Sequence, residues 1–312
     1  MKLLGFDIGG TKCAVIAADW DNGQLTVTNR LSIATDHELS PERMIEKLIA
    51  LMPDARPERI GISCGGPLDD RAGVILSPPN LPGWRNVPIV KIIRDHYQVP
   101  TFLQNDANAG ALAEWRFGAG RGCENLIFMT FGTGLGAGLI LNGKLYSGTN
   151  GNAGEVGHVG LEPNGPIGFG KAGSFEGFCS GGGLAQLGYR MAVDSLAKGI
   201  RPLYFREGMS KNEVTAKSIA AAAEAGDQTA LDVFRICAEH LGQGLSILID
   251  ILNPQVIAIG GIFGWCRSLL WPIAEKVIGE QALSVSSSCC RVLPAELGEK
   301  IGDYAALATA LQ

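Results

Sequence analysis

The chain opens with Lys2-Leu3-Leu4-Gly5-Phe6-Asp7-Ile8-Gly9-Gly10-Thr11-Lys12, the stretch that decides how its first half folds. The apolar start predicts a strand, the glycine pair a tight turn, and the apolar run 14–17 a second strand, so the whole stretch predicts a β-hairpin. Such a turn presents bare backbone N–H groups, which bind phosphate well. It differs from a Walker or dinucleotide-binding loop, because those loops open a helix.

A second turn of the same kind lies in the other half of the chain. The stretch Gly132-Thr133-Gly134-Leu135-Gly136-Ala137-Gly138 separates the apolar runs 126–131 and 139–141. One glycine-rich turn is weak evidence, since such turns are common in β-rich chains. Two of them, both with a threonine and one opening on Asp7, predict a nucleotide site split between two domains. A length of 312 residues suits two α/β domains.

Hydrophobic periodicity and turn residues place the remaining elements. We expect strands at 2–7, 13–19, 25–33, 60–64, 101–103, around 126–145 and at 256–259. We expect helices at 41–52, 89–97, 107–117, 181–197, 215–225, 228–252, 265–278 and 303–311. This order predicts a smaller domain of residues 1–104, completed by the C-terminal helix 303–312, and a larger domain of residues 105–302.

Composition narrows the class of protein. The net charge of −5 and the lack of a Lys/Arg-rich run argue against a nucleic-acid partner. No apolar stretch reaches the roughly 18 residues of a membrane span, and the chain starts directly in a strand, which predicts neither a membrane partner nor a signal peptide. The eight cysteines form no Cys-x-x-Cys pair, which predicts reduced, mostly buried thiols in a cytoplasmic protein, with Cys289 and Cys290 as small core residues.

Six segments, in this order, resemble the ROK family (repressors, open reading frames and kinases) of the actin/hexokinase/Hsp70 superfamily. They are Asp7–Lys12, Asn105–Ala109, Thr133–Gly138, Gly154–His158, Ile259–Gly261 and Gly302–Ala305. The resemblance implies an α/β fold of two actin-like (ribonuclease H-like, ASKHA) ATPase domains around a central cleft. It also implies an ATP:hexose phosphotransferase that uses ATP and Mg²⁺, phosphorylates a hexose or N-acylhexosamine at the 6-hydroxyl, and forms a homodimer.

Asp106 is the candidate general base. Phosphoryl transfer needs the acceptor hydroxyl aligned with the γ-phosphate, and a carboxylate within reach accepts its proton. Asp106 follows the expected strand at 101–104 and stands at the N-terminus of helix 107–117, where the helix dipole favours an ionised side chain. The alternative role is a plain N-cap. The adjacent Asn105 and the two glycine-rich turns favour catalysis, with Asn105 bonded to a sugar hydroxyl.

The nucleotide is expected at the two turns. Asp7 is expected to hold Mg²⁺ through water, because this ion keeps most of its waters; a turn-forming Asp is the alternative. Thr11, Lys12 and Thr133 are expected near the β- and γ-phosphates, although Lys12 also fits a solvated surface charge. Gly260-Gly261 lets adenine or ribose approach, or simply ends a strand. The full set is Asp7, Gly9, Gly10, Thr11, Lys12, Gly132, Thr133, Gly134, Gly260 and Gly261.

Sugar hydroxyls both donate and accept, so a sugar site needs acceptors and donors together. Glu155 and His158 lie three apart in a glycine-flanked loop, and the resemblance implies that they grip the sugar, with Glu176 as a further carboxylate. The stretch 77–84 resembles the hexose-contacting loop of glucokinase-like members. The full set expected at the sugar is Gly66, Asn80, Asn105, Glu155, His158 and Glu176.

The chain departs from the family at its zinc motif, Cys-x-Cys-Gly-x-x-Gly-Cys-x-Glu. Aligned on Glu176, the three cysteine positions are Ile167, Phe169 and Ser174. Zinc needs about four ligands, and His158 alone cannot supply them, so we expect no structural zinc. We expect Ile167 and Phe169 to replace the metal by apolar packing that holds His158 and Glu176 in place.

Several readings remain open at this point. The sugar is glucose or an N-acylhexosamine such as N-acetylmannosamine or N-acetylglucosamine, with the loop Asn80–Trp84 favouring glucose-type substrates. The donor is ATP or polyphosphate. A non-catalytic, sugar-sensing regulator of the same family carries a DNA-binding segment before the first turn, and we expect none here because that turn starts at residue 7. A sugar-binding or chaperone-like ATPase would not need a base such as Asp106.

Overall fold

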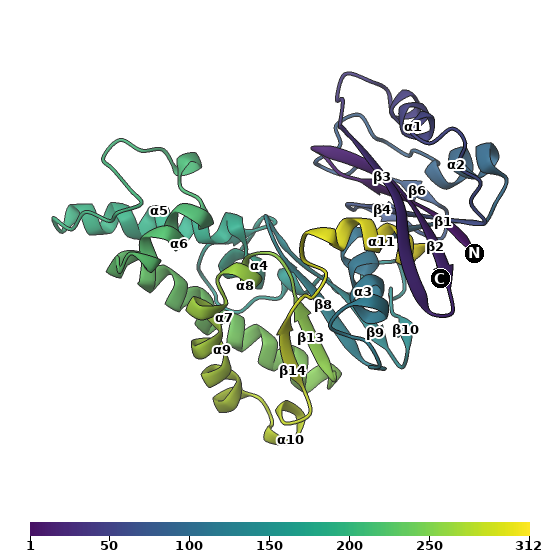
Figure 1. Cartoon of the computed structure of the whole chain (residues 1–312). Helices are drawn as coiled ribbons and strands as arrows, with labels where there is room; N and C mark the ends of the chain where they lie inside the picture. Colours follow the sequence, from purple (N-terminus) through teal and green to yellow (C-terminus); the bar gives the residue numbers. More distant parts are fainter.

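The computed structural model describes residues 1–312 as two α/β halves, each built on a five-stranded sheet (Figure 1). The first sheet has the order β3-β2-β1-β4-β7, with β1–β3 antiparallel and β4 and β7 parallel to β1. Its strands are β1 (Lys2–Ile8), β2 (Lys12–Asp21), β3 (Gln24–Ala34), β4 (Arg59–Cys64) and β7 (Thr101–Asn105). A small hairpin of β5 (Leu68–Asp69) and β6 (Val74–Ile75) follows β4.

Helices cover both faces of this first sheet. On one face, α1 (Pro41–Ala50) and α2 (Ile89–Tyr97) pack through a common apolar core that includes Phe6 and Ile62. On the other face lies the C-terminal helix α11 (Ile301–Thr309), whose Leu307 packs against Leu3. The C-terminus of the chain therefore returns to the sheet on which the N-terminus starts, as the yellow and purple segments of Figure 1 show.

The second sheet has the order β10-β9-β8-β13-β14, with β8–β10 antiparallel and β13 and β14 parallel to β8. Its strands are β8 (Leu126–Phe131), β9 (Leu135–Leu141), β10 (Lys144–Leu145), β13 (Val256–Ile259) and β14 (Arg291–Pro294). Helix α3 (Asp106–Phe117) packs on one face through small residues such as Ala109 and Ala111, against Phe128. The two sheets meet through α3 and α11, which pack against each other.

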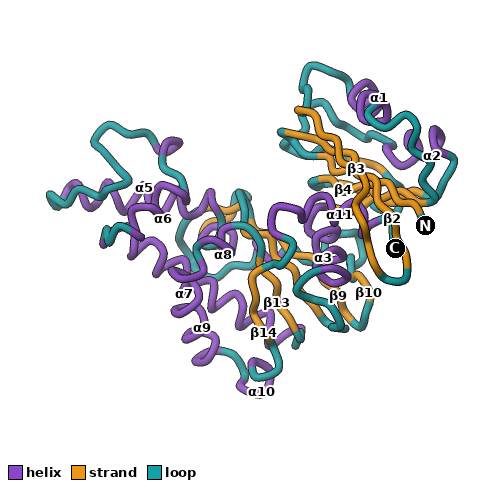
Figure 2. Tube along the Cα trace, in the orientation of Figure 1, coloured by secondary structure: helices purple, strands orange, loops and turns teal.

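The other face of the second sheet carries a mostly helical region (Figure 2). Its helices are α4 (Phe175–Phe178), α5 (Gly181–Ala197), α6 (Ala216–Glu224), α7 (Gln228–Leu252), α8 (Ile262–Trp265), α9 (Arg267–Gln281) and α10 (Ser284–Ser287). The short hairpin of β11 (Ile167–Gly168) and β12 (Lys171–Ala172) precedes α4. None of the helices combines the length and the apolar character needed to cross a membrane.

The α/β class and both hairpin turns are confirmed, since β1–β2 and β8–β9 are antiparallel pairs. The helix expected at 265–278 is observed as α9, which begins two residues later because the backbone of Cys266 leaves the helical region, while Trp265 ends the short helix α8. Strand β14 was not predicted, since it is only four residues long and ends on a proline. Six cysteines are buried as expected, but Cys289 is exposed and does not belong to the core.

Candidate active site

The first glycine-rich turn joins β1 to β2 and is closed by its own backbone. The N–H of Gly9 donates to the carbonyl of Lys12 at 3.2 Å. Thr35, just after β3, braces the turn from outside, because its hydroxyl donates to the Gly9 carbonyl at 2.6 Å and its N–H to the Thr11 carbonyl at 3.0 Å. No local motif marks Thr35, and its role was missed in the sequence. The side chains of Thr11 and Lys12 are exposed.

The second turn, 132–134, is braced by the start of α5. The N–H groups of Gly181 and Gly182 donate to the carbonyls of Gly132 and Thr133 at 2.8 and 3.2 Å. Gly261 lies against the Phe131 carbonyl with φ +65°, so a side chain there is excluded both by strain and by contact. Bare backbone from three segments therefore meets at the ends of β8 and β13, which is where Gly260 and Gly261 were predicted to act with the second turn.

Asp7 lies at the end of β1, half-buried, in an acidic environment. Burial raises its pKa to about 6, the nearby Asp303 adds to the rise, and Lys12 opposes it. Asp303 comes from the first turn of α11 and is held by Arg30, whose Nε donates to it at 2.7 Å. Next to it, an ideal Cβ on Gly302 would lie 2.5 Å from Oδ2 of Asp7. Neither Arg30 nor Asp303 was assigned a role from the sequence.

Asp106 is the first residue of α3, and Asn105 is the N-cap. The Asn105 side chain accepts from the N–H of Asn108 at 2.7 Å, so the capping role considered for Asp106 is filled by its neighbour. The Asp106 carboxylate accepts from the N–H of Ala107 at 2.9 Å.

The pKa of Asp106 shifts against the direction expected from the helix dipole. Solvent reaches the side chain, yet the surrounding protein desolvates it, and this desolvation raises its pKa. The backbone N–H groups of Ala107 and of Asp106 itself offset part of the rise. The N–H groups at the start of α3 thus favour the ionised side chain, as expected, but desolvation is the larger effect on its pKa.

Asn80 and Asp106 come together around Gly65. An ideal Cβ on Gly65 would lie 3.6 Å from both polar atoms of the Asn80 side chain and 4.0 Å from Oδ2 of Asp106. The backbone of Asn80 also touches Gly10 in the first turn. The adjacent Gly66 is exposed. The structure thus brings Asn80, predicted at the sugar, beside Asp106, the predicted base, and the same Asn80 touches the first glycine-rich turn.

Glu155 and His158 are exposed on a short 3₁₀ turn, η1 (Val156–His158), that rests on β9. Gly154 touches the carbonyl of Ala137, and the carbonyl of Ala107 touches the next strand residue, Gly138. The backbone next to Glu155 and the backbone next to Asp106 therefore both contact strand β9, at adjacent residues. No direct hydrogen bond joins Glu155 or His158 to Asp106.

Glu176 binds the second turn rather than standing free. Its Oε2 accepts from the N–H of Leu135 at 2.9 Å, and an ideal Cβ on Gly134 would lie 2.7 Å from the same oxygen. The side chain comes from α4, whose N-cap is Ser174. Glu176 therefore links the region expected to bind sugar to the turn expected to bind phosphate, and this second contact was not predicted.

The packing expected of Ile167 and Phe169 was wrong. Their side chains are 53% and 86% exposed, because the β11–β12 hairpin turns them outward. Polar contacts hold this region instead: Nζ of Lys171 donates to the His158 carbonyl at 2.8 Å, and the Ser174 hydroxyl accepts from the N–H of Gly177 at 3.1 Å. No group of three or more His, Cys, Asp or Glu side chains is arranged to hold a metal ion.

Comparison with known proteins identifies the family to which the chain is similar. The model of the ROK family matches residues 3–312. A glucokinase of Thermotoga maritima is 32% identical over 284 residues, which cover 89% of this chain and 87% of that protein. The regulator NagC of Escherichia coli, a DNA-binding transcriptional regulator, is 30% identical over 274 residues, which cover 87% of this chain and 63% of NagC. A ROK family glucokinase from Streptomyces griseus, solved with glucose and AMPPNP, aligns over 100% of both chains with a TM-score of 0.77 and 32% identity.

Proposed function

The chain belongs to the ROK family as a sugar kinase, and from this premise we propose that it transfers the γ-phosphoryl group of ATP to the 6-hydroxyl of a glucose-like hexose. The observation that carries the proposal is the position of Asn80, whose side chain lies beside Asp106 at Gly65 and whose backbone touches Gly10 of the first glycine-rich turn. A base, an amide for hydroxyls and a phosphate-binding turn are the three parts that phosphoryl transfer to an alcohol needs.

Asp106 is proposed as the general base. Its Oδ1 is occupied by the N–H of Ala107, and Oδ2 faces the space beside Gly65, where an acceptor hydroxyl would lie. The raised pKa supports this role, because a base works best when its pKa approaches the operating pH. The proton passes from the sugar hydroxyl to Oδ2 as the new O–P bond forms and the bond from the γ-phosphorus to the bridging oxygen breaks, so that ADP leaves with that oxygen.

Asp7 is proposed to hold Mg²⁺ through water. Its carboxylate is half-buried beside Asp303, and burial together with this neighbour raises its pKa, so an added cation would relieve an existing repulsion. Mg²⁺ supplies charge neutralisation of the phosphates. Thr11 and Lys12 in the first turn and Gly132–Gly134 in the second are proposed to bind the phosphates, with Gly260 and Gly261 beside the nucleoside.

The sugar is proposed to bind between Asn80 and the 3₁₀ turn that carries Glu155 and His158, with Gly66, Asn105 and Glu176 as further contacts. Buried Leu81 and Trp84 anchor the loop that presents Asn80. Glucose-type substrates are favoured by this loop and by the similarity to glucokinases. N-acetylmannosamine and N-acetylglucosamine are the alternatives.

The test is ADP release across a panel of glucose, mannose, N-acetylglucosamine and N-acetylmannosamine, with polyphosphate as the competing donor. Asp106→Asn is expected to lower kcat about 10²- to 10⁴-fold while the protein still binds sugar in calorimetry. Asp95→Asn, an equivalent change in an exposed carboxylate on α2, is the control and keeps its rate. Phosphorus NMR of the product reports which hydroxyl is modified. An Asp106→Asn protein with the wild-type rate would overturn the assignment.

A regulator that binds DNA is the second candidate function, because the regulator NagC is 30% identical to this chain over 274 residues, which cover 87% of it. This second candidate function predicts that the protein binds sugar without turning it over and shifts labelled promoter DNA in a gel.

We also propose that the protein is cytoplasmic and acts as a homodimer. Light scattering in solution checks the homodimer. We also propose the division into residues 1–104 with 303–312 and residues 105–302 as the two rigid bodies. Small-angle scattering with and without sugar and AMPPNP tests whether these bodies close.

A further inference from the structure

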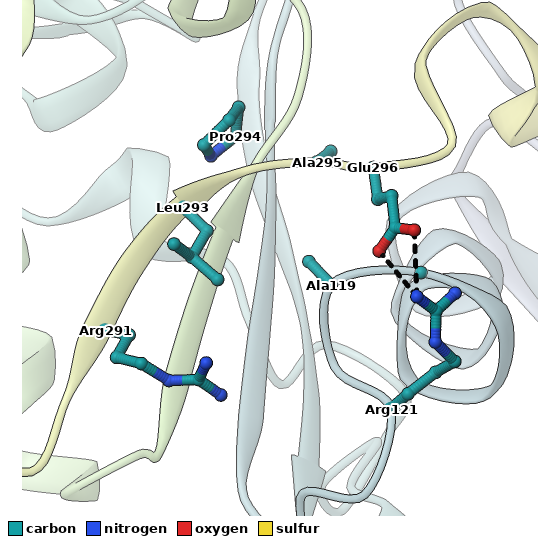
Figure 3. Close-up of a pocket in the computed structure, with 8 residues that line it drawn as sticks. Ala119, Arg121, Arg291, Leu293, Pro294, Ala295 and Glu296 are labelled. Atoms are coloured by element: carbon teal, nitrogen blue, oxygen red, sulfur yellow. Dashed lines mark hydrogen bonds and ion pairs between the residues drawn. The ribbon is translucent and has the colours of Figure 1, made fainter.

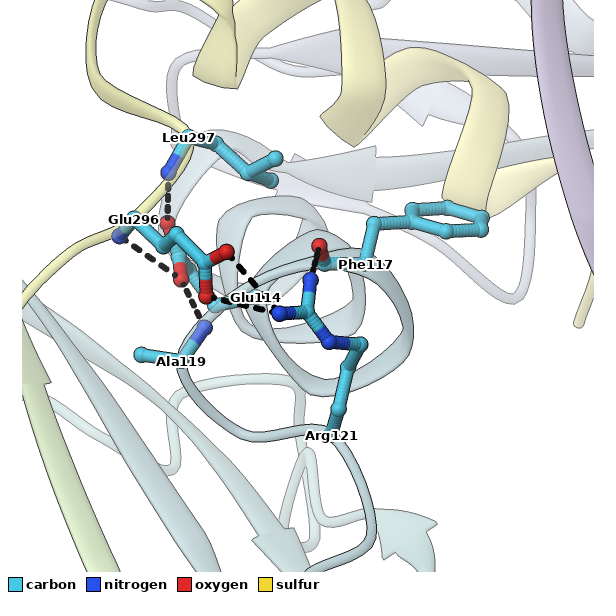
Figure 4. Close-up of polar contacts among 6 residues, drawn as sticks. All are labelled: Glu114, Phe117, Ala119, Arg121, Glu296 and Leu297. Atoms are coloured by element: carbon cyan, nitrogen blue, oxygen red, sulfur yellow. Dashed lines mark hydrogen bonds and ion pairs between the residues drawn. The ribbon is translucent and has the colours of Figure 1, made fainter.

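Glu114 is a fully buried carboxylate outside the reacting centre. It lies in the last turn of α3 with 0% exposure. No basic side chain pairs with it, and its partners are backbone N–H groups from two separate segments (Figure 4). A buried, unpaired carboxylate is costly unless its oxygens are satisfied, so this arrangement calls for an explanation.

The geometry satisfies both oxygens. Oε2 accepts from the N–H of Ala119 at 2.8 Å and from the N–H of Glu296 at 3.1 Å, while Oε1 accepts from the N–H of Leu297 at 2.9 Å. Gly118 lies directly against Oε2, where no side chain fits. The carboxylate thus joins the segment that ends α3 to the segment that leads from β14 into α11.

Both joined segments lead to the proposed reacting centre. Asp106 lies on the same helix as Glu114, at its opposite end. Leu297 precedes α11, whose first turn places Gly302 against Asp7 and Asp303 on Arg30. The two helices also pack directly on each other. The positions of Gly302 and Asp303 against Asp7 therefore depend on how α11 is fixed against α3.

We propose that Glu114 is a positioning residue that locks the start of α11 to the end of α3 and so sets Gly302 and Asp303 against Asp7. This inference rests on the proposed kinase function. A carboxylate is required because it only accepts, and three donors converge on it. A glutamine amide keeps one acceptor oxygen and directs its N–H groups at a backbone donor, which loosens at least one of the two segments.

An exposed ion pair beside the buried carboxylate provides the matched control. Arg121 and Glu296 contact each other at 2.9 Å, with side chains 57% and 50% exposed, along an open groove of about 440 Å³ (Figure 3). Exposed pairs contribute little. Glu296→Gln changes this pair and leaves the N–H of Glu296, which binds Glu114, in place.

The experiment compares Glu114→Gln, Gly118→Ala and Glu296→Gln in steady-state kinetics and in hydrogen exchange of the full-length protein. Glu114→Gln is expected to lower kcat about 10- to 100-fold, because misplacing reacting groups by about 1 Å has effects of this size. KM for the sugar is expected to change less than about threefold, because the substitution disturbs the alignment of the reacting groups and leaves the sugar contacts in place. The amides of Ala119, Glu296 and Leu297 exchange faster in this variant.

Gly118→Ala keeps the charge but presses on Oε2, and the same loss of kcat is expected. It also serves if Glu114→Gln does not fold. Glu296→Gln keeps the wild-type kcat and exchange. Equal kcat in wild type, Glu114→Gln and Gly118→Ala overturns the inference, as does a loss that falls on KM alone. If the wild type is inactive on every sugar, the proposed kinase function is refuted instead. Failure of the Glu114 inference and failure of the proposed function are therefore distinguishable.

Discussion

Asp7→Asn is expected to make the protein more stable at pH 8 while abolishing activity. The folded-state pKa of Asp7 is about 6, above the ordinary 3.8, because burial and Asp303 disfavour its charge. A raised carboxylate pKa means that ionised Asp7 destabilises the fold once the pH lies above both values. The penalty disappears as the pH falls below the unfolded pKa, since both states are then protonated.

The magnitude follows from the size of the shift. A rise from 3.8 to about 6 corresponds to about 3 kcal/mol at most, at 1.36 kcal/mol per pH unit. Solvent screening of a half-buried group reduces this, and we expect a gain of about 1–2 kcal/mol for Asp7→Asn at pH 8. At pH 5 the folded wild type is mostly protonated at Asp7, so the gain is expected to shrink by roughly half.

Urea unfolding of wild type and Asp7→Asn at pH 5 and pH 8, without nucleotide, measures both numbers. Added Mg²⁺ and AMPPNP are expected to stabilise the wild type and to have a smaller effect on the variant, since ligand binding stabilises only the state that binds it. Asp19→Asn, the same change at an exposed carboxylate in the neighbouring strand β2, is the control and is expected to leave the stability unchanged. A variant that is less stable than wild type at pH 8, or a gain that is equal at both pH values, refutes the reasoning.

Three further changes test other parts of the site. Gly261→Ala is expected to raise KM for ATP several-fold and to lower the melting temperature, because the new methyl group meets the Phe131 carbonyl at an unfavourable φ. Steady-state kinetics and calorimetry measure these changes, and an unchanged KM for ATP contradicts the prediction. Lys171→Met removes the donor to the His158 carbonyl, and a rise in sugar KM of about fivefold with ATP KM unchanged is expected from the loss of one charge-assisted hydrogen bond. Phe169→Ser is expected to leave the melting temperature within about 1 °C, since its side chain is exposed; a large loss would mean that it packs against something after all.

The parts of the site that sequence reasoning located are those where backbone meets backbone. Such close approaches leave no room for side chains, so the sequence has glycines beside apolar strands at these points, as at Gly9-Gly10 and Gly261. Asp106 could be placed too, because a carboxylate between a strand and a helix has a local signature. The order of strands and helices could also be predicted, because the spacing of apolar residues is a local property of the sequence.

Contacts between distant segments could not be read in this way. Arg30 and Asp303 are 273 positions apart, and neither stands in a pattern that names the other. The outward turn of Ile167 and Phe169 depends on the hairpin that carries them, which apolar character alone does not reveal. The pKa direction of Asp106 required knowledge of how much protein surrounds it.

Glu114 and Glu176 explain why carboxylates are the hardest residues to assign. Both accept from backbone N–H groups of segments remote in sequence: Glu176 from Leu135, and Glu114 from Leu297. A backbone donor exists at every residue except proline, so it leaves no trace in the sequence of the segment that is bound. The same property makes these carboxylates effective ties between loops, because a bound segment need only present its main chain. A glutamate that sequence alone assigns to a ligand can therefore instead fix the loop beside the site, as Glu176 does at Leu135 of the second turn.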